Sequence, residues 1–516
     1  MTSYEFQIYD TTDRLFVQLS YGEGDEMRLN RDCCTGCGYC LLVCPHDALG
    51  NDGWAFLRPE RCTDCNACLY ACPNGCFTPD RPPRRRARNY GDGYDALIIG
   101  AGLGGLMTAA ALARQGWQVA LFEQLGFPGG RYTEIRYHGY QITTGAWTPL
   151  GPRSNIGRFL AEVGAQVRWI TLRDRAVGGR VPDLFHIAFA DGRYYRRFDE
   201  FLTSREMRAY ARALAMGRRP GAEGISIHDH LARWVPNPDL LAVADANVCT
   251  ASGLRATQVP ASEYTVIVQE TRAVGADFGF PIGGPRAIVQ ALLQVVRKAG
   301  GRLFTRSPVT RILLEDGRAV GVQLATGEQV RATRVIHNGG PARLRRLVGE
   351  ENLPADYRAR LRGLKDVPCG ALVLGLREPL FPEVPMLLTP GAQRVVGIFA
   401  PTFFDPTLAP PDRHQVDVFF PLESEDRRAE LARVWEDLRT LFPRLDALVE
   451  VAVPMLFTGG WTGAESGQYV GQTGEARLSP QTPIEGLYLV GMDLQGSAVA
   501  GDIVPLGVRR LLEVLA

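Results

Sequence analysis

Residues 95–123 read DALIIGAGLGGLMTAAALARQGWQVALFE, and this stretch decides how the rest of the chain is interpreted. An apolar strand is predicted to lead into Gly100-x-Gly102-x-x-Gly105, followed by a helix of small residues and a second strand. The glycines allow a tight turn, close approach of the backbone to a pyrophosphate and close packing of helix on strand. Free N–H groups at the helix N-terminus would face the phosphates. The stretch therefore predicts a βαβ unit that binds a dinucleotide.

Glu123 ends the second predicted strand, about 20 residues after the glycines, where a carboxylate can accept hydrogen bonds from the hydroxyls of an adenosine ribose. A transmembrane helix is the alternative, because residues 96–113 carry no charge over a length near the lower limit for a span. Three close glycines, Gly102, Gly104 and Gly105, follow strand-like residues and argue against a span. The motif by itself leaves NAD and FAD equally open.

Composition limits the function classes. The chain has 516 residues, 46% of them hydrophobic, which suffices for about two to four domains with real cores. A formal net charge of +1 argues against a general nucleic-acid-binding protein or a binder of anionic membranes. The first residues lack a basic start followed by an apolar run, so we expect no export signal and a cytoplasmic protein. Peripheral contact with a membrane stays open.

Ten of the twelve cysteines fall between residues 33 and 76, and eight of them repeat the spacing C-x2-C-x2-C-x3-C-P. This region, residues 28–80, resembles a bacterial-type ferredoxin with two [4Fe-4S] clusters. In such runs three thiolates hold one cluster while the fourth crosses over to the other cluster. We therefore expect cluster one on Cys34, Cys37, Cys40 and Cys72, and cluster two on Cys62, Cys65, Cys68 and Cys44.

Two zinc sites are the alternative, and they are disfavoured because zinc modules space their cysteine pairs differently. Cys33 and Cys76 lie outside both runs. We expect each to be a neighbouring or spare thiol rather than a ligand. Clusters held by four cysteines usually carry single electrons, so the module is predicted to transfer electrons rather than to catalyse.

The sequence continues after Glu123 with Gly126-Phe-Pro-Gly129-Gly130-Arg131. Two adjacent glycines and an arginine can wrap a pyrophosphate with backbone donors and one fixed positive charge. Following the βαβ unit directly, this combination resembles the large family of FAD-containing amine oxidases and phytoene desaturases. The resemblance favours FAD over NAD as the cofactor.

The resemblance spans about residues 94–516 and is closest to the branch of phytoene desaturases, carotenoid isomerases and retinol saturases. It includes a glycine turn and helix from residue 280, a strand ending near residue 338, and a closing segment over 483–493. The family's contacts imply further cofactor-binding residues, namely Gly145, Val309, Asn338, Gly491 and Asp493.

Two departures from the family pattern affect these contacts. Many relatives carry an acidic residue directly after the final glycine, whereas Met492 separates Gly491 from Asp493 here. Relatives often have aspartate before the glycine at Gly145, where this chain has Thr143 and Thr144.

The expected fold class is α/β, with a Rossmann-type FAD-binding domain, an inserted α+β substrate domain and a small N-terminal ferredoxin-like α+β domain. Aromatic and aliphatic stretches in the substrate domain fit an apolar tunnel and ordinary core packing equally well. The expected boundaries are a hairpin extension over 1–29, a ferredoxin domain over 30–80, a linker over 81–93, an FAD-binding domain over 94–150 with 279–345 and 479–516, and a substrate domain over 151–278 with 346–478.

No Ser-His-Asp set, metal-histidine pair or second nucleotide fingerprint is evident in the sequence, so NAD(P)H is not the expected electron source. Reduction or oxidation of a C–C bond by a flavin needs hydride transfer and at most one proton donor. Residues able to handle that proton cluster in two segments, 263–272 and 460–469, although each is more often structural. The candidate catalytic residues are Tyr264, Glu270, Trp461 and Tyr469.

We expect an iron–sulfur flavoprotein in which two clusters pass electrons to FAD for reduction of a C=C bond in a hydrophobic, isoprenoid-like substrate. Low-potential clusters favour this direction of electron flow. The resembling family also desaturates and isomerises, so a desaturase or isomerase with the clusters as electron exit remains an alternative. An electron-transfer subunit serving a quinone or another redox protein is a third. An external low-potential electron donor or acceptor protein is the expected partner.

Overall fold

The computed structural model describes residues 27–79, 88–145, 150–458 and 466–516. Most of the hairpin predicted over 1–29 and most of the linker predicted over 81–93 lie outside these residues, as does Trp461.

The glycine motif forms the predicted βαβ unit. Strands β5 (Tyr94–Ile99) and β6 (Val119–Phe122) pair in parallel, and helix α2 (Leu103–Arg114) connects them. Gly102 precedes the first helical residue and supplies no side-chain cap, so the N–H groups of the first turn keep no side-chain partner there. The start of α2 therefore has the donors that an anionic ligand requires.

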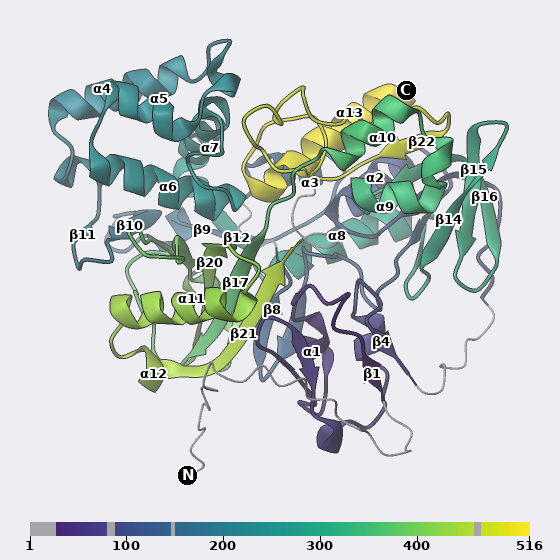
Figure 1. The fold of residues 1–516 in the computed structure, drawn as a ribbon, viewed down its shortest axis with the longest axis horizontal. Coiled ribbons are helices and arrows are strands. Elements are labelled where there is room, and N and C mark those ends of the chain that lie inside the picture. The colour runs from purple at the N-terminus through teal and green to yellow at the C-terminus, as the bar shows by residue number, and fades with distance from the viewer. Residues whose placement is uncertain (1–26, 80–87, 146–149, 459–465) are drawn as a thin grey trace.

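Helix α2 lies at the centre of an apolar core. Helices α8 (Pro285–Lys298) and α13 (Val504–Leu515) pack against it, and residues 103–113 are all buried. The charge-free run is thus a core helix covered by other helices (Figure 1). None of the helices in the described part of the chain combines the length and apolar content that a membrane span needs.

The βαβ strands belong to a seven-stranded sheet with the order β13-β6-β5-β16-β15-β14, in which β22 pairs in parallel with β16. The carboxyl ends of β5, β6 and β16 meet at one edge, where ligands bind in open α/β sheets. The other strands are β13 (Arg302–Phe304), β14 (Val309–Glu315), β15 (Arg318–Leu324), β16 (Gln329–His337) and β22 (Leu487–Leu489).

A second seven-stranded sheet has the order β11-β10-β18-β19-β20-β17-β21. Its central strands are apolar on both faces because helices of the chain pack on both of them, residues 238–252 on one side and residues 427–448 on the other. The strands are β10 (Phe185–Ala188), β11 (Tyr194–Tyr195), β17 (Cys369–Leu376), β18 (Met386–Leu388), β19 (Gly397–Phe399), β20 (His414–Pro421) and β21 (Val449–Phe457).

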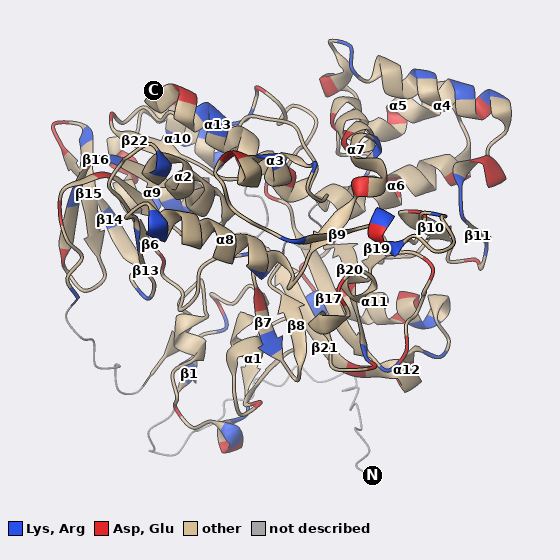
Figure 2. Cartoon of the chain, turned by 180° about the vertical axis from the view of Figure 1, so that it is seen from behind, with Lys and Arg blue, Asp and Glu red and all other residues tan. Residues whose placement is uncertain are grey.

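A helical lobe stands beside the second sheet (Figure 1). It consists of α4 (Ser204–Met216), α5 (Ile227–Trp234), α6 (Pro238–Ser252) and α7 (Ala261–Val274). Helix α4 begins with a complete capping box between Thr203 and Glu206. Figure 2 shows basic and acidic residues interspersed over the lobe and over both sheets, in keeping with the small net charge.

The remaining elements connect these layers. They are α3 (Asn155–Glu162), α9 (Pro341–Val348), α10 (Ala355–Arg362), α11 (Arg427–Leu441), α12 (Leu445–Leu448), β7 (Glu134–Tyr137), β8 (Tyr140–Thr143), β9 (Trp169–Thr171) and β12 (Gly279–Pro281). The mixed α/β architecture confirms the expected fold class, whereas the exact domain boundaries stay predictions.

The cysteine-rich region folds as a small unit beneath the first sheet and beside β21 (Figure 1). Strand β1 (Arg28–Leu29) pairs with β4 (Phe77–Thr78), so the two ends of the unit lie side by side. Its other elements are α1 (Tyr39–Val43), β2 (Leu49–Asn51) and β3 (Ala55–Leu57).

The small unit is hydrogen-bonded to both larger parts of the molecule. Leu456 of β21 donates its N–H to the carbonyl of Gly36 over 2.9 Å, and the Asn51 amide donates to the carbonyls of Gly36 and Pro454, each over 2.8 Å. On the other side Gly126 donates its N–H to the carbonyl of Tyr70 over 2.7 Å. These contacts fix the position of the cysteine runs relative to the glycine motif.

Candidate functional site

A cavity of about 770 Å³ opens at the carboxyl edge of the first sheet. Twelve of the thirteen residues predicted to bind the cofactor line it, and Gly105 is the exception. A Cβ at Gly105 would lie 2.1 Å from the Gly100 carbonyl oxygen, so this glycine permits the packing of α2 against β5. The lining members are Gly100, Gly102, Gly104, Glu123, Gly129, Gly130, Arg131, Gly145, Val309, Asn338, Gly491 and Asp493.

The floor of the cavity is made by glycines packed around Asn338. A Cβ at Gly102 would lie 2.9 Å from the Asn338 amide nitrogen, and one at Gly104 would lie 2.6 Å from its oxygen. Gly129 adopts φ +105° and donates its N–H to the Ala101 carbonyl over 2.7 Å. Only glycine fits such approaches, and the floor therefore presents backbone rather than side chains, as a pyrophosphate requires.

Glu123 is buried on the cavity wall with both carboxylate oxygens fixed by backbone donors. Its Oε2 accepts the N–H of Ala101 and its Oε1 accepts the N–H of Leu125, each over 2.8 Å. Burial raises the pKa of Glu123, and the two N–H bonds oppose that shift. Each oxygen keeps a second lone pair, so the carboxylate can still accept hydrogen bonds from the two hydroxyls of a ribose.

Four buried polar atoms of lining residues have no hydrogen-bond partner within the described protein: Thr35 Oγ1, His337 Nδ1, Ser466 Oγ and Arg477 Nε. Burial lowers the pKa of His337 to about 4, so its imidazole is neutral. Orphaned polar atoms in a buried wall indicate a polar ligand that satisfies them. Together with the glycine floor, they show that the wall fits FAD.

Arg477 is a buried cation that sequence reasoning missed. Its side chain is 1% exposed, and Nη2 donates to the carbonyls of Ser466 and Met492, each over 2.6 Å. Asp493 accepts the N–H of Ser466 over 2.9 Å, which orients its carboxylate beside this arginine. Burial lowers the pKa of Arg477, while Asp493 and Glu263 act in the opposite direction. No local motif marks this residue.

Electrostatic repulsion between the thiols of the cysteine runs is consistent with the two ligand sets predicted for the clusters, and the assignment of ligands stays a prediction. Burial and repulsion from Cys72 and Cys34 raise the pKa of Cys37 to about 12. The pKa of Cys40 is raised by burial and by repulsion from Cys37, Cys72, Cys34 and Cys68. Burial and repulsion from Cys65 and Cys62 raise the pKa of Cys68 to about 12, and Cys44 adds to the raised pKa of Cys62. The fourth thiol of each run thus lies with the other run.

Backbone N–H groups point at three of these sulfurs: Ala48 N to Cys44 Sγ over 3.2 Å, and Ala55 N to Cys34 Sγ and Cys76 N to Cys72 Sγ over 3.3 Å. Such bonds tune iron–sulfur clusters. Within the described residues, no three side chains of His, Cys, Asp or Glu meet closely enough for a single metal ion. A cubane is larger than one ion and holds its thiolates apart, so the sulfur sets fit [4Fe-4S] groups, whose number stays a prediction.

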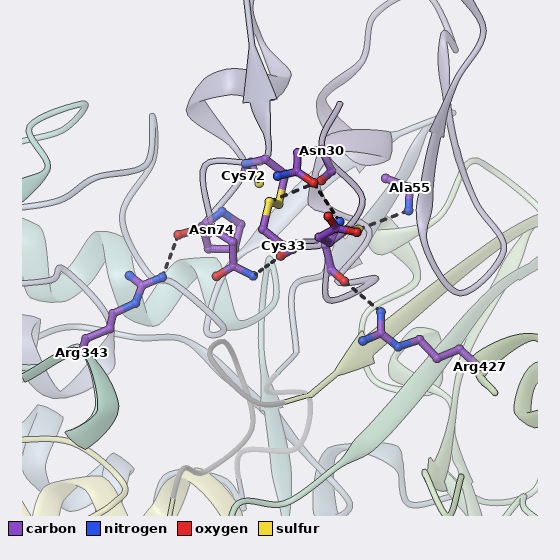
Figure 3. Close-up of a disulfide and its surroundings, with 11 residues drawn as sticks. Asn30, Cys33, Ala55, Cys72, Asn74, Arg343 and Arg427 are labelled. Atoms are coloured by element: carbon purple, nitrogen blue, oxygen red, sulfur yellow. Dashed lines mark hydrogen bonds between the residues drawn. A yellow bond between two sulfur atoms is a disulfide. The ribbon is translucent and has the colours of Figure 1, made fainter. Parts of the chain in front are cut away.

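Cys33 and Cys76 form a disulfide with a Cα–Cα distance of 5.8 Å (Figure 3). The expectation that they are not ligands agrees with this pairing, but the expectation of two separate thiols is wrong. The antiparallel pairing of β1 with β4 brings both residues together, which their separation in sequence conceals. The disulfide would lie beside cluster one, because Cys33 precedes Cys34 and the N–H of Cys76 bonds to Cys72.

The same cavity reaches the cysteine-rich unit. Residues 32–35 and 73–74 line its wall, next to the predicted cluster-one ligands Cys34 and Cys72. Cys65, a predicted ligand of cluster two, is exposed to solvent. Cluster one would therefore stand between the cavity and cluster two.

Residues of the second sheet and of the helical lobe also line the cavity. Its apolar surface comes from Phe419, Phe420 and Phe457, with Cys249 and Cys369 beside them. Burial raises the pKa of Cys369 to about 12, which keeps this thiol neutral. These aromatic side chains give an apolar ligand a complementary wall.

None of the described candidate catalytic residues lines the cavity. Tyr264 is 1% exposed and shares a 3.0 Å hydrogen bond with the hydroxyl of Tyr210. Glu270 accepts the N–H of Val499 over 2.9 Å, and burial raises its pKa to about 7. Tyr469 donates to the carbonyl of Asp366 over 2.9 Å. These bonds are structural, and the catalytic assignments, including that of Trp461 outside the described residues, stay predictions.

Three family models match the chain. The model described as flavin containing amine oxidoreductase matches residues 244–502, half of the chain. A model of an NAD(P)-binding Rossmann-like domain matches residues 98–163, and a model of a 4Fe-4S binding domain matches residues 27–50.

Individual proteins are similar over large parts of the chain. Prolycopene isomerase 2 of an Oncidium hybrid cultivar is 24% identical over 424 residues, covering 71% of this chain and 70% of that protein. A neurosporene-forming phytoene desaturase of Cereibacter sphaeroides is 29% identical over 287 residues, covering 48% and 53%. Among solved structures, an oxidoreductase from Methanosarcina mazei superposes with a TM-score of 0.71 at 28% identity, covering 81% of this chain and 99% of that one.

Proposed function

The chain belongs to the family of flavin containing amine oxidoreductases, and on that basis we propose that its two [4Fe-4S] clusters pass electrons to FAD for reduction of a C=C bond in a hydrophobic substrate. It is an FAD-dependent oxidoreductase with a 4Fe-4S binding motif. The number of clusters, the electron route and the substrate class belong to the proposal.

The observation that carries the proposal is the shared wall. Residues 32–35 and 73–74 of the cysteine-rich unit line the same cavity as the glycine floor and Glu123. An iron–sulfur unit that served only a distant partner would have no reason to contribute to this wall. The contact supports electron transfer within one chain.

When bound, FAD supplies hydride transfer to or from carbon. The glycines and the start of α2 would hold its pyrophosphate, and Glu123 would hold its ribose. Phe419, Phe420 and Phe457 would exclude water from the substrate end and bind an apolar molecule. The names of the similar isomerase and desaturase support a substrate of the carotenoid or isoprenoid kind.

The proposal is tested with anaerobically photoreduced or dithionite-reduced protein mixed with polyprenoid alkenes. We expect reoxidation of the flavin absorbance together with a product heavier by two hydrogens, detected by mass spectrometry. If no alkene reoxidises the flavin and a saturated substrate bleaches it instead, reduction is the wrong direction.

Desaturation or isomerisation with the clusters as electron exit is the second candidate. The names of the similar proteins favour it, because one is a desaturase and the other an isomerase. The experiment above separates it from reduction. A third candidate is an electron-transfer subunit that serves a quinone or another redox protein. It predicts that neither an alkene nor a saturated substrate changes the flavin spectrum.

The exposed position of Cys65 supports an external electron donor or acceptor protein at cluster two. We further propose a cytoplasmic location with peripheral contact to a membrane, because an apolar substrate of this kind partitions into lipid. Cell fractionation with and without high salt tests this placement.

A further inference from the structure

Two arginines of the flavin-bearing part reach the ligand loops of cluster one. Arg427, the first residue of α11, donates from Nη1 to the carbonyls of Cys34 over 2.9 Å and Gly53 over 3.3 Å. Its guanidinium carbon lies 4.9 Å from the centre of the Trp54 ring. This cation is therefore held in one place beside a predicted ligand rather than free in solvent.

Arg343 of α9 approaches from the other side (Figure 3). Its Nη2 donates to the carbonyl of Pro73 over 2.7 Å, directly after the predicted ligand Cys72. Both arginines also line the cavity. Cluster one would thus have a fixed positive charge on each of two ligand segments.

Among the described residues, a fixed carboxylate rather than a fixed cation lies beside a ligand of cluster two. The carboxylate of Asp32, two residues before Cys34, is exposed, where water and salt screen its charge. The Asp64 carboxylate lies 3.7 Å from the sulfur of Cys62 and accepts the N–H of Met27 over 3.2 Å, which holds it there. Arg58 donates to the carbonyl of Asp47, which is three residues beyond the predicted ligand Cys44. Arg427 and Arg343, in contrast, bond to the carbonyl of a predicted ligand or of the residue next to one. Arg61 is exposed, where water and salt screen its charge.

Reduction of a cluster adds one electron, and hence one negative charge, without making or breaking a bond. A nearby cation stabilises the reduced state and a nearby anion destabilises it. We infer that Arg427 and Arg343 raise the reduction potential of cluster one above that of cluster two, whose potential Asp64 lowers. Electrons entering at the exposed side of cluster two then move to cluster one and to the cavity. The inference rests on the proposed two-cluster function and assigns its internal direction.

The test is a redox titration of the intact, cluster-loaded protein followed by electron paramagnetic resonance. The native protein should show two separate reduction steps. R427Q should lower the reduction potential of the higher step, and D64N should raise the potential of the lower step. Each variant should therefore reduce the difference between the two potentials. R428Q is the matched control, because Arg428 is the adjacent exposed residue and pairs with Asp52 over 2.6 Å; it should leave both steps in place.

Two further variants keep the result decisive. R427K retains the charge and should restore the native higher step, which a merely structural role would not predict. Should R427Q fail to assemble cluster one, R343Q and D64N decide the question. The inference is overturned if neither R343Q nor D64N changes a reduction potential, or if R343Q changes the potential of the lower step.

Iron analysis separates this inference from the proposed function. A native protein with only one cluster contradicts the two-cluster function itself. A native protein with two clusters and a single common reduction step contradicts the electrostatic ordering alone.

Discussion

The hydroxyl of Tyr39 donates a hydrogen bond to the carbonyl oxygen of Thr144 over 2.5 Å. Tyr39 lies between the predicted ligands Cys37 and Cys40, and Thr144 immediately precedes Gly145 of the cavity wall. The Thr144 hydroxyl in turn donates to the carbonyl of Gly130 over 2.9 Å. One chain of hydrogen bonds therefore connects the cysteine-rich unit to the Gly129-Gly130-Arg131 turn. Thr144 contributes both a carbonyl and a hydroxyl to this chain, which suits threonine to the position where relatives often carry aspartate.

We expect Tyr39→Phe to weaken this junction. Tyr39 is fully buried, so the variant leaves the Thr144 carbonyl unsatisfied at a cost of about 1 to 3 kcal/mol. Urea unfolding followed by visible absorbance of the iron–sulfur chromophore should show a lower midpoint. Tyr70→Phe is the control, because the backbone carbonyl of Tyr70, not its hydroxyl, bonds to Gly126. Equal midpoints for Tyr39→Phe and the native protein would contradict the junction.

Gly104→Ala should impair FAD retention. Its Cβ would lie 2.6 Å from Asn338 Oδ1 and 3.1 Å from the Gly491 Cα, which overpacks the cavity floor by about 1 to 3 kcal/mol. The ratio of flavin to protein after purification measures the effect. Gly224→Ala is the control because nothing lies within 4 Å of its added Cβ. A full flavin content in Gly104→Ala would show that Asn338 can move away.

Local spacing explains what the sequence could predict. The glycine motif and the cysteine runs specify contacts within short segments, so α2 appears as expected, whereas the assignment of the eight thiols to two clusters stays a prediction. The cavity residues from distant segments, such as Val309 and Gly491, were predicted through the family resemblance rather than from physics alone.

Contacts between distant segments explain what could not be predicted. Arg343, Arg427 and Arg477 reach the site from helices or loops without any motif. Pairing of Cys33 with Cys76 depends on the antiparallel strands that bring them together. The chemistry of Glu270 suggests a catalytic role, but its side chain bonds to Asn155 and Val499 and does not line the cavity.

Glu270→Gln should stabilise the protein above neutral pH. Burial raises the pKa of Glu270 from its ordinary 4.5 to about 7, so the folded state favours the neutral acid. Stability from this group is complete below about pH 4.5 and falls as pH rises to about 7. The neutral amide avoids that loss, so its advantage should be absent near pH 4.5 and reach about 1 to 3 kcal/mol above pH 7.

Denaturant unfolding of native protein and Glu270→Gln at pH 5 and pH 8 measures this difference. An advantage that is larger at pH 5 would contradict the raised pKa. Substrate turnover by the same variant separates structure from catalysis: retained activity assigns Glu270 to packing, and lost activity at native stability restores it as a catalytic residue.

Replacing Cys33 or Cys76 by serine should lower stability but leave the clusters intact. A disulfide typically contributes about 2 to 4 kcal/mol, while neither residue belongs to a thiol set predicted to hold iron. Thermal unfolding and iron content, measured on Cys33→Ser and Cys76→Ser separately, should show the loss of stability without loss of iron. Cys249→Ser, outside the cysteine runs and buried as a free thiol, is the comparison for a serine in place of a thiol. If Cys33→Ser loses iron but keeps native stability, Cys33 is a ligand, because loss of the disulfide alone would lower stability and leave the iron content unchanged.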